Sequence, residues 1–90
     1  MIDVNGHVLC PGDYVWVRYG PEYDFTLACN SWIGIVSVEE PIESIPTKPH
    51  SRMMYPVIRW RKPGHIIDYK FETNLKFINN EEMMLHFLEN

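Results

Sequence analysis

Apolar and polar residues alternate in short stretches of this chain, and turn-forming residues separate the stretches. The stretch at residues 14–18 reads YVWVR, so its two valines point to one face of a strand, and Tyr14, Trp16 and Arg18 point to the other. A Pro-Gly-Asp turn precedes this stretch, and a Gly-Pro pair opens the loop that follows it. Short alternating stretches bounded by turns predict a small, mainly β domain.

Further strands are predicted in the segments SWIGIVSVEE (31–40), MYPVIRW (54–60), IIDYKFE (66–72) and NLKFIN (74–79). Gly34 lies inside the first of these segments, which indicates a bend or the close approach of another part of the chain. Trp32 shares the phase of Gly34 and Val36, so we expect its indole to pack in the core. The segment 40–54 contains three prolines and is predicted to be a long loop.

Residues 80–89 are predicted to form a short C-terminal α-helix. Asn80 is the expected N-cap, and the two glutamates that follow it suit the positive end of the helix dipole. Met84, Phe87 and Leu88 share one face of this helix. Such a stripe is more typical of a lid over the open end of a β-barrel than of a docking surface.

The composition is that of one folded domain, residues 1–90, with a barrel at about 11–79 and the helix at about 80–89. Hydrophobic residues make up 46% of the chain, which excludes a wholly disordered protein. No apolar run approaches the ~20 residues that cross a bilayer, and the N-terminus lacks the features of a signal peptide. We therefore expect a cytoplasmic protein.

The two cysteines, Cys10 and Cys29, are expected to be reduced thiols that are buried or half-buried. The spacing His7-x-x-Cys10 matches no standard zinc-ligand pairing, so neither a metal nor another cofactor is predicted. Catalytic motifs are also missing, because the chain has no phosphate-binding loop and no nucleophile motif. The sequence thus favours a binding protein over an enzyme.

The net charge of −4 is distributed unevenly along the chain. Residues 1–47 carry a net charge of −6, residues 48–76 carry +5, and residues 77–90 carry −3. A basic middle third can attract an anionic partner even when the whole chain is acidic. The candidate nucleic-acid-binding residues in this third are Arg52, Arg59, Arg61, Lys62 and Lys70.

Most of the basic stretch YPVIRWRKPGHIIDYKF (55–71) can also be explained as a β-hairpin with a KPGH turn. The simplest register sets three pairs opposite one another: Trp60 with Ile67, Ile58 with Tyr69, and Arg59 with Asp68. The apolar pairs, together with Phe71, are expected to line the core. Arg59 and Asp68 would then form a surface ion pair worth about 0–1 kcal/mol.

The outward face of the first strand is the candidate protein-binding surface, because a Trp-Tyr-Arg set has the composition of a binding hot spot. Its residues are Tyr14, Trp16, Arg18 and Tyr19, extended by the 40–54 loop. The alternative is that the loop at 20–30 or the C-terminal helix folds over Trp16. Sequence alone leaves both readings open.

The order of the motifs resembles the SH3-like small barrels, such as Tudor, PWWP and KOW domains. The matching segments are GDYVWV, WIGIV, YPVIRW, a Pro-Gly turn, DYKF and LKFIN, which span about residues 11–79. The resemblance implies a five-stranded SH3-like small barrel with a short C-terminal α-helix. It implies the fold more strongly than any function.

Two relatives within this group share further features with the chain. The hemimethylated-DNA-binding heat-shock protein Q has a similar GIV…EEP strand, which implies nucleic-acid binding. The type II dihydrofolate reductases also run from a Gly-Asp strand to a Pro-Gly hairpin. Where those enzymes bind substrate with Val-Gln-Ile-Tyr, this chain reads Ile66-Ile67-Asp68-Tyr69.

We therefore predict a non-enzymatic module that binds a protein partner. Its small size and acidic charge lead to the hypothesis of a phage or mobile-element protein that modulates a host protein in the host cytoplasm. The alternative is a small barrel that binds nucleic acid, of the KOW or hemimethylated-DNA-binding type. An enzyme similar to the type II dihydrofolate reductases is the distant third.

Overall fold

The computed structural model describes residues 1–26, 29–45, 51–62, 64 and 66–88. Within this part of the chain, the elements in order are β1 (Tyr14–Arg18), β2 (Ser31–Val36), β3 (Ile42–Glu43), β4 (Met53–Arg59), β5 (Ile67–Lys70), the 3₁₀ turn η1 (Glu72–Asn74), β6 (Leu75–Phe77) and α1 (Asn80–Leu88). The chain is therefore mainly β with a C-terminal helix, which confirms the predicted class. Residues 46–50 of the predicted loop, two residues of the predicted Pro-Gly turn and residue 89 of the predicted helix lie outside the described residues.

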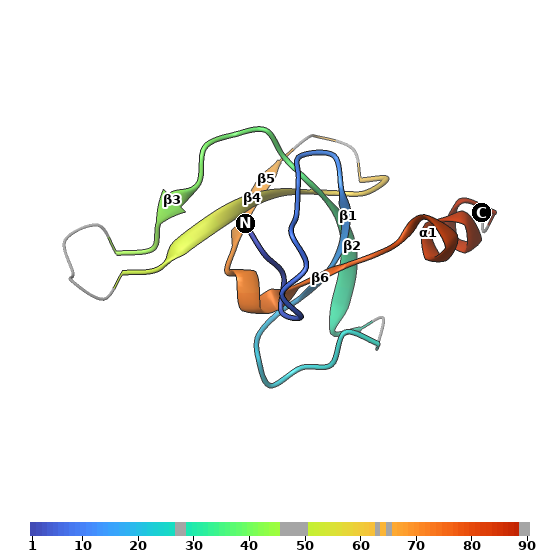
Figure 1. Cartoon of the computed structure of the whole chain (residues 1–90), viewed down its shortest axis with the longest axis horizontal. Helices are drawn as coiled ribbons and strands as arrows, with labels where there is room; N and C mark the ends of the chain where they lie inside the picture. Colours follow the sequence, from blue (N-terminus) through green and yellow to red (C-terminus); the bar gives the residue numbers. More distant parts are fainter. Residues whose placement is uncertain (27–28, 46–50, 63, 65, 89–90) are drawn as a thin grey trace.

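The strands form one antiparallel sheet in the order β3-β4-β2-β1-β6, and β5 pairs with β4. Figure 1 shows this sheet at the centre of the molecule, with β3 and α1 at opposite ends. Among the described residues, no strand pairing joins β5 to β6, so the described strands form an open sheet. β3 was not predicted: Ile42 and Glu43 pair with the start of β4, inside the segment expected to be a loop.

The hydrophobic core lies on one face of the sheet. Val15 and Val17 of β1 are fully buried, as their alternation predicts. The buried cluster consists of Leu9, Val15, Val17, Val36, Val57 and Leu75. Trp32 packs against this cluster, which confirms its predicted inward position.

The β4–β5 pairing differs from the predicted register by two residues. Ile58 lies opposite Ile67, and Asp68 lies opposite Val57. The predicted register assumed a short KPGH turn, whereas residues 60–66 connect the two strands. A shift of two residues keeps every side chain on its predicted side of the hairpin, because strand side chains alternate with a period of two.

The predicted core side of this hairpin is wrong. Val57 is fully buried in the core, whereas Ile58 and Trp60 lie on the opposite side and are half-buried. Ile67, Tyr69 and Phe71, which were expected in the core as well, are also half-buried. β4 carries apolar residues on both sides, so alternation alone could not tell which side faces the core.

The N-cap of α1 lies one residue earlier in the sequence than predicted. The side-chain Oδ1 of Asn79, not that of Asn80, accepts a hydrogen bond from the backbone N–H of Glu82 at 2.8 Å. An Asx side chain in this position satisfies one of the free N–H groups of the first turn. Asn79 is therefore the N-cap of α1.

The expectation that Met84, Phe87 and Leu88 form a buried lid is also wrong. Their exposed fractions are 58%, 44% and 76%, whereas the neighbouring Met83 is only 1% exposed. Figure 1 places α1 beyond the end of β6, to the side of the sheet. Met83 is therefore the buried residue of this helix, and the rings of His86 and Phe87 also contact aromatic residues of the sheet side.

The N-terminal segment is tied to the sheet by a buried carboxylate. Asp3 is 5% exposed, and its oxygens accept hydrogen bonds from the backbone N–H groups of Asn5, His7 and Phe77 at 2.8–2.9 Å. The His7 ring also stacks on the Phe77 ring at 3.9 Å between centroids. Three donors satisfy this carboxylate and offset the cost of burying its charge.

Two further expectations can be compared with the structure. Cys10 and Cys29 are free thiols, but both are exposed rather than buried, because each lies in a turn outside the core. No helix in the described part of the chain is long and apolar enough to cross a membrane.

Candidate functional site

Two adjoining clefts lie beside the β4–β5 connection. One has a volume of about 230 Å³ and is lined by Ile58, Arg59, Lys62, Ile66 and Asp68. The other has a volume of about 460 Å³ and is lined by Trp32, Ile33, Arg59, Trp60, Arg61 and Lys62. Arg59 and Lys62 line both clefts, so cationic groups form the boundary between them.

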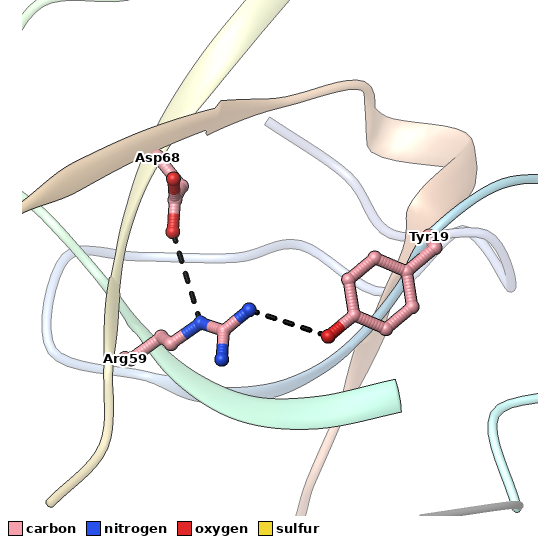
Figure 2. A network of polar contacts seen from close by, with 3 residues as sticks. All are labelled: Tyr19, Arg59 and Asp68. Atoms are coloured by element: carbon pink, nitrogen blue, oxygen red, sulfur yellow. Dashed lines mark hydrogen bonds and ion pairs between the residues drawn. The ribbon is translucent and has the colours of Figure 1, made fainter. Parts of the chain in front are cut away.

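Arg59 is held at this boundary by three neighbours. Its Nε lies 3.9 Å from Oδ2 of Asp68, and its Nη2 donates a 3.3 Å hydrogen bond to the hydroxyl of Tyr19, as Figure 2 shows. Its guanidinium carbon lies 4.5 Å from the centroid of the Trp32 ring. The predicted contact with Asp68 is thus confirmed, although the two residues are diagonal rather than opposite.

The ion pair leaves most of the Arg59 donors available. The Arg59 and Asp68 side chains are 34% and 40% exposed, so water screens their attraction. A guanidinium carries five N–H donors, and Nη1 of Arg59 has no partner among the described residues. Arg59 can therefore bind an anion without first losing its existing contacts.

A second guanidinium lies over a second tryptophan. The guanidinium carbon of Arg61 is 4.2 Å from the centroid of the Trp60 ring. Arg61 follows Trp60 after the end of β4, and its φ of 59° lies in the left-handed region. The stacked pair therefore lies at the start of the turn.

Lys62 and Lys70 complete the positive charge around the clefts. Lys62 is exposed and has no ion-pair partner within the described ranges. The ammonium nitrogen of Lys70 lies 5.9 Å from the centroid of the Trp32 ring. Asp68 is the sole carboxylate among the lining residues, so the clefts carry a net positive charge in an acidic molecule.

Trp32 was expected to be a core residue only, and its second role was missed. One part of its indole packs on the core, and its ring lies beneath Arg59. The pairing of Gly34 with Arg59 places Trp32, two residues from Gly34, diagonally below Arg59. Its indole N–H is buried without an acceptor among the described residues, which is rare in folded proteins.

The predicted protein-binding residues do not form one surface. Tyr14 and Trp16 lie under α1: the Tyr14 ring contacts that of Phe87 at 5.7 Å, and the Trp16 ring contacts that of His86 at 5.3 Å. The C-terminal helix therefore half-covers Trp16, which was one of the two alternatives. Tyr19 lies instead beside Arg59, in the cationic clefts.

Arg18, the fourth predicted protein-binding residue, is engaged within the molecule. Its guanidinium donates hydrogen bonds to the carbonyl of Thr73 at 2.7 Å, to Oδ1 of Asn74 at 3.2 Å and to the carbonyl of Tyr23 at 3.3 Å. Its guanidinium carbon also lies 4.5 Å from the centroid of the Phe25 ring. Arg18 thus fixes the β1–β2 loop to η1.

Arg52 lies apart from the other predicted cations. It precedes β4, whereas Arg59 ends this strand, and seven residues of a strand span about 23 Å. Its guanidinium stacks on the Phe71 ring at 4.3 Å and donates a hydrogen bond to the Thr73 hydroxyl. Of the five predicted cations, the structure brings together Arg59, Arg61, Lys62 and Lys70.

Comparison of the chain with models of known protein families, with curated proteins and with solved structures found no match. Within the described part of the chain, no three His, Cys, Asp or Glu side chains lie close enough together to hold a metal ion.

Proposed function

We propose that this protein is a non-enzymatic interaction module that binds a protein partner through α1. The observation that carries the proposal is the exposure of apolar side chains along this helix. Met84, Leu85, Phe87 and Leu88 are 58%, 64%, 44% and 76% exposed. Contiguous apolar surface on a small soluble protein is typical of an interaction site.

The aromatic residues beneath α1 support the same proposal. The rings of Tyr14, Trp60 and Phe87 contact one another edge to face, with centroids 5.5–6.4 Å apart. Aromatic rings fixed in this way form a rigid base and lose little conformational entropy when a partner binds. We therefore replace the predicted surface around Arg18 with one formed by α1 and this cluster.

The length of α1 is a further argument for a bound partner. A nine-residue helix is too short to be stable alone in water, and Met83 is its sole buried residue in the described range. A partner that covers Leu85 and Leu88 would supply the burial that the sheet does not provide. Apolar anchors of this kind make binding insensitive to salt, because no counterions are released.

We also propose that the fold is an SH3-like small barrel. Its support is the strand order β6-β1-β2-β4-β5, in which a 3₁₀ turn leads into the last strand. In addition, β4 and β5 form a hairpin, and β1 lies between β2 and the last strand, β6. Amide hydrogen exchange at the facing edges of β5 and β6 tests whether the barrel is closed, because paired strands protect their amides.

Capture experiments with matched surface variants test the proposed function. Leu85→Asp and Leu88→Asp place a charge on the exposed face of α1, and Val38→Asp places one at a site that is 80% exposed and lies outside α1. Each tagged variant is incubated with lysate of the cells that encode the protein, with and without nuclease treatment. Its urea unfolding midpoint is measured in parallel, so that loss of folding is not mistaken for loss of binding.

We expect both helix variants to lose the partner that the wild type and Val38→Asp retain, with all unfolding midpoints unchanged. Capture by both helix variants would refute the proposal. Loss of the partner upon nuclease treatment alone would also refute it, because the bridge would then be a nucleic acid.

A further inference from the structure

We infer that the two clefts beside the β4–β5 connection form a binding site for a nucleotide unit, that is, a planar base joined to a phosphate. This site adjoins the proposed protein-binding surface at Trp60, which lines the second cleft and also contacts Phe87 of α1. Its cationic residues, Arg59, Arg61 and Lys62, belong to the end of β4 and the residues after it, whereas the apolar side chains proposed to bind a protein lie on α1. The inference therefore does not depend on the proposed function.

The phosphate-binding groups are Arg59 and Lys62, which line both clefts. Nε of Arg59 lies 3.9 Å from Asp68, and Nη2 donates to Tyr19, so Nη1 is the nitrogen without a partner among the described residues. Figure 2 shows Asp68 and Tyr19 on two sides of the guanidinium and the third nitrogen directed away from both. A guanidinium N–H donor beside a lysine ammonium is well suited to bind phosphate oxygens.

The base-binding groups are Trp60 and Arg61. The guanidinium carbon of Arg61 lies 4.2 Å from the centroid of the Trp60 ring. Arg61 is exposed, so a nucleobase can extend this stack over the guanidinium. Bases stack on both tryptophan rings and arginine guanidinium planes.

The local charge limits the size of the ligand. The cations that line the clefts lie at the end of β4 and just after it, and the chain as a whole has a net charge of −4. The net acidic charge disfavours a long duplex, which carries many phosphates, more than it disfavours one or two nucleotide units bound at the cationic clefts. The same chemistry is offered by a free nucleotide and by a short single strand.

Titration of the intrinsic tryptophan fluorescence tests the site. The ligands are AMP, adenosine, inorganic phosphate, single-stranded tetra- and octathymidylate, and a duplex of equal length, each at about 50 mM and 200 mM salt. We expect saturable binding of AMP or of the single strands, and weaker binding of adenosine and of phosphate alone. Equal affinity for AMP and for the strands identifies a free nucleotide as the ligand, and tighter binding of the strands identifies single-stranded nucleic acid.

Three variants that each remove one positive charge provide the matched comparison. Arg61→Asn removes a guanidinium but keeps a residue that accepts a positive φ. Lys62→Asn removes the exposed ammonium that lines both clefts, and Arg52→Asn removes a guanidinium that is likewise stacked on an aromatic ring, but far from the clefts. Urea midpoints of all three confirm that they fold.

We expect Arg61→Asn to weaken binding by about 5- to 150-fold, the range for loss of one stacked base. Lys62→Asn is expected to weaken binding and to reduce the steepness of log K against log salt concentration by about one. Arg52→Asn should bind as the wild type does. Equal losses in Arg52→Asn and the cleft variants, tighter binding of the duplex than of single strands, or no saturation of any ligand up to about 1 mM would each refute the site.

Discussion

The backbone of Gly34 on β2 lies directly against the side chain of Val57 on β4. A Cβ atom at Gly34 would clash with Cγ1 of Val57 and would lie 2.9 Å from Cζ3 of Trp32. Val57 is fully buried and β-branched, so it cannot move aside easily. This contact brings β2 and β4 close together at the point where Arg59 begins to line the clefts.

We therefore predict that Gly34→Ala destabilises the fold by about 1–3 kcal/mol, the usual cost of overpacking a core. Urea unfolding followed by circular dichroism measures the loss. Val57→Ala alone should also destabilise the protein, because it leaves a cavity. The double variant should lose less than the two single variants together, since the smaller residue makes room for the new methyl group. If the two losses of stability were strictly additive, the Val57 side chain would not be what limits the space at Gly34.

Arg18→Lys should reduce stability by about 1–2 kcal/mol although the charge is kept. Arg18 holds Tyr23, Thr73 and Asn74 through a planar fork of donors, which a lysine ammonium cannot reproduce. Charge-assisted hydrogen bonds of this kind are stronger than neutral ones. The measurement is the urea midpoint, with Arg52→Lys as the control at a more exposed stacked arginine. An unchanged midpoint in Arg18→Lys would return Arg18 to the list of candidate partner-binding residues.

Truncation of Met83 should destabilise the protein, whereas truncation of the neighbouring Met84 should leave its stability nearly unchanged. Met83 is 1% exposed, and Met83→Ala should cost about 2–3 kcal/mol of the free energy of unfolding. Met84 is 58% exposed, and Met84→Ala should stay within about 0.5 kcal/mol of the wild type. Thermal unfolding of the two variants provides the comparison. Similar losses in both would mean that α1 packs on the sheet through a broader face.

Asn79→Ala should destabilise α1 by about 1 kcal/mol, whereas Asn80→Ala should have little effect. Oδ1 of Asn79 accepts the N–H of Glu82, and a lost N-cap leaves this donor without its partner. Amide exchange of the first helical turn and the global urea midpoint measure the two effects. Greater loss in Asn80→Ala would restore Asn80 as the cap, which is the assignment that sequence favours.

Several features of the fold could be predicted from the sequence because their causes are local. The alternation in YVWVR assigns Val15 and Val17 to the core, since adjacent strand residues must point to opposite faces. The glycine in SWIGIV indicates a close approach, because a residue without a side chain inside a strand needs such a reason. The helix at the C-terminus follows from its acidic first turn, although its N-cap is Asn79 rather than the predicted Asn80.

The candidate site could be predicted only in part. Arg59, Arg61, Lys62 and Lys70 stand close together in the sequence, so their common location follows from chain proximity. Trp32 joins them through the β2–β4 register, which brings residues far apart in sequence into diagonal contact. Arg52 leaves the group because it lies at the far end of the same strand.

The sequence by itself determined the β class, the inward valines of β1 and the terminal helix, because backbone geometry and capping act over a few residues. The tertiary structure alone decided that Val57 rather than Ile58 enters the core, that Met83 rather than Met84 anchors α1, and that Trp32 lies beneath Arg59. In each of these cases, neighbouring residues have similar hydrophobicity, so the local pattern does not indicate which of them is buried. The choice is made by strand register and helix orientation, which depend on how all the elements pack at once.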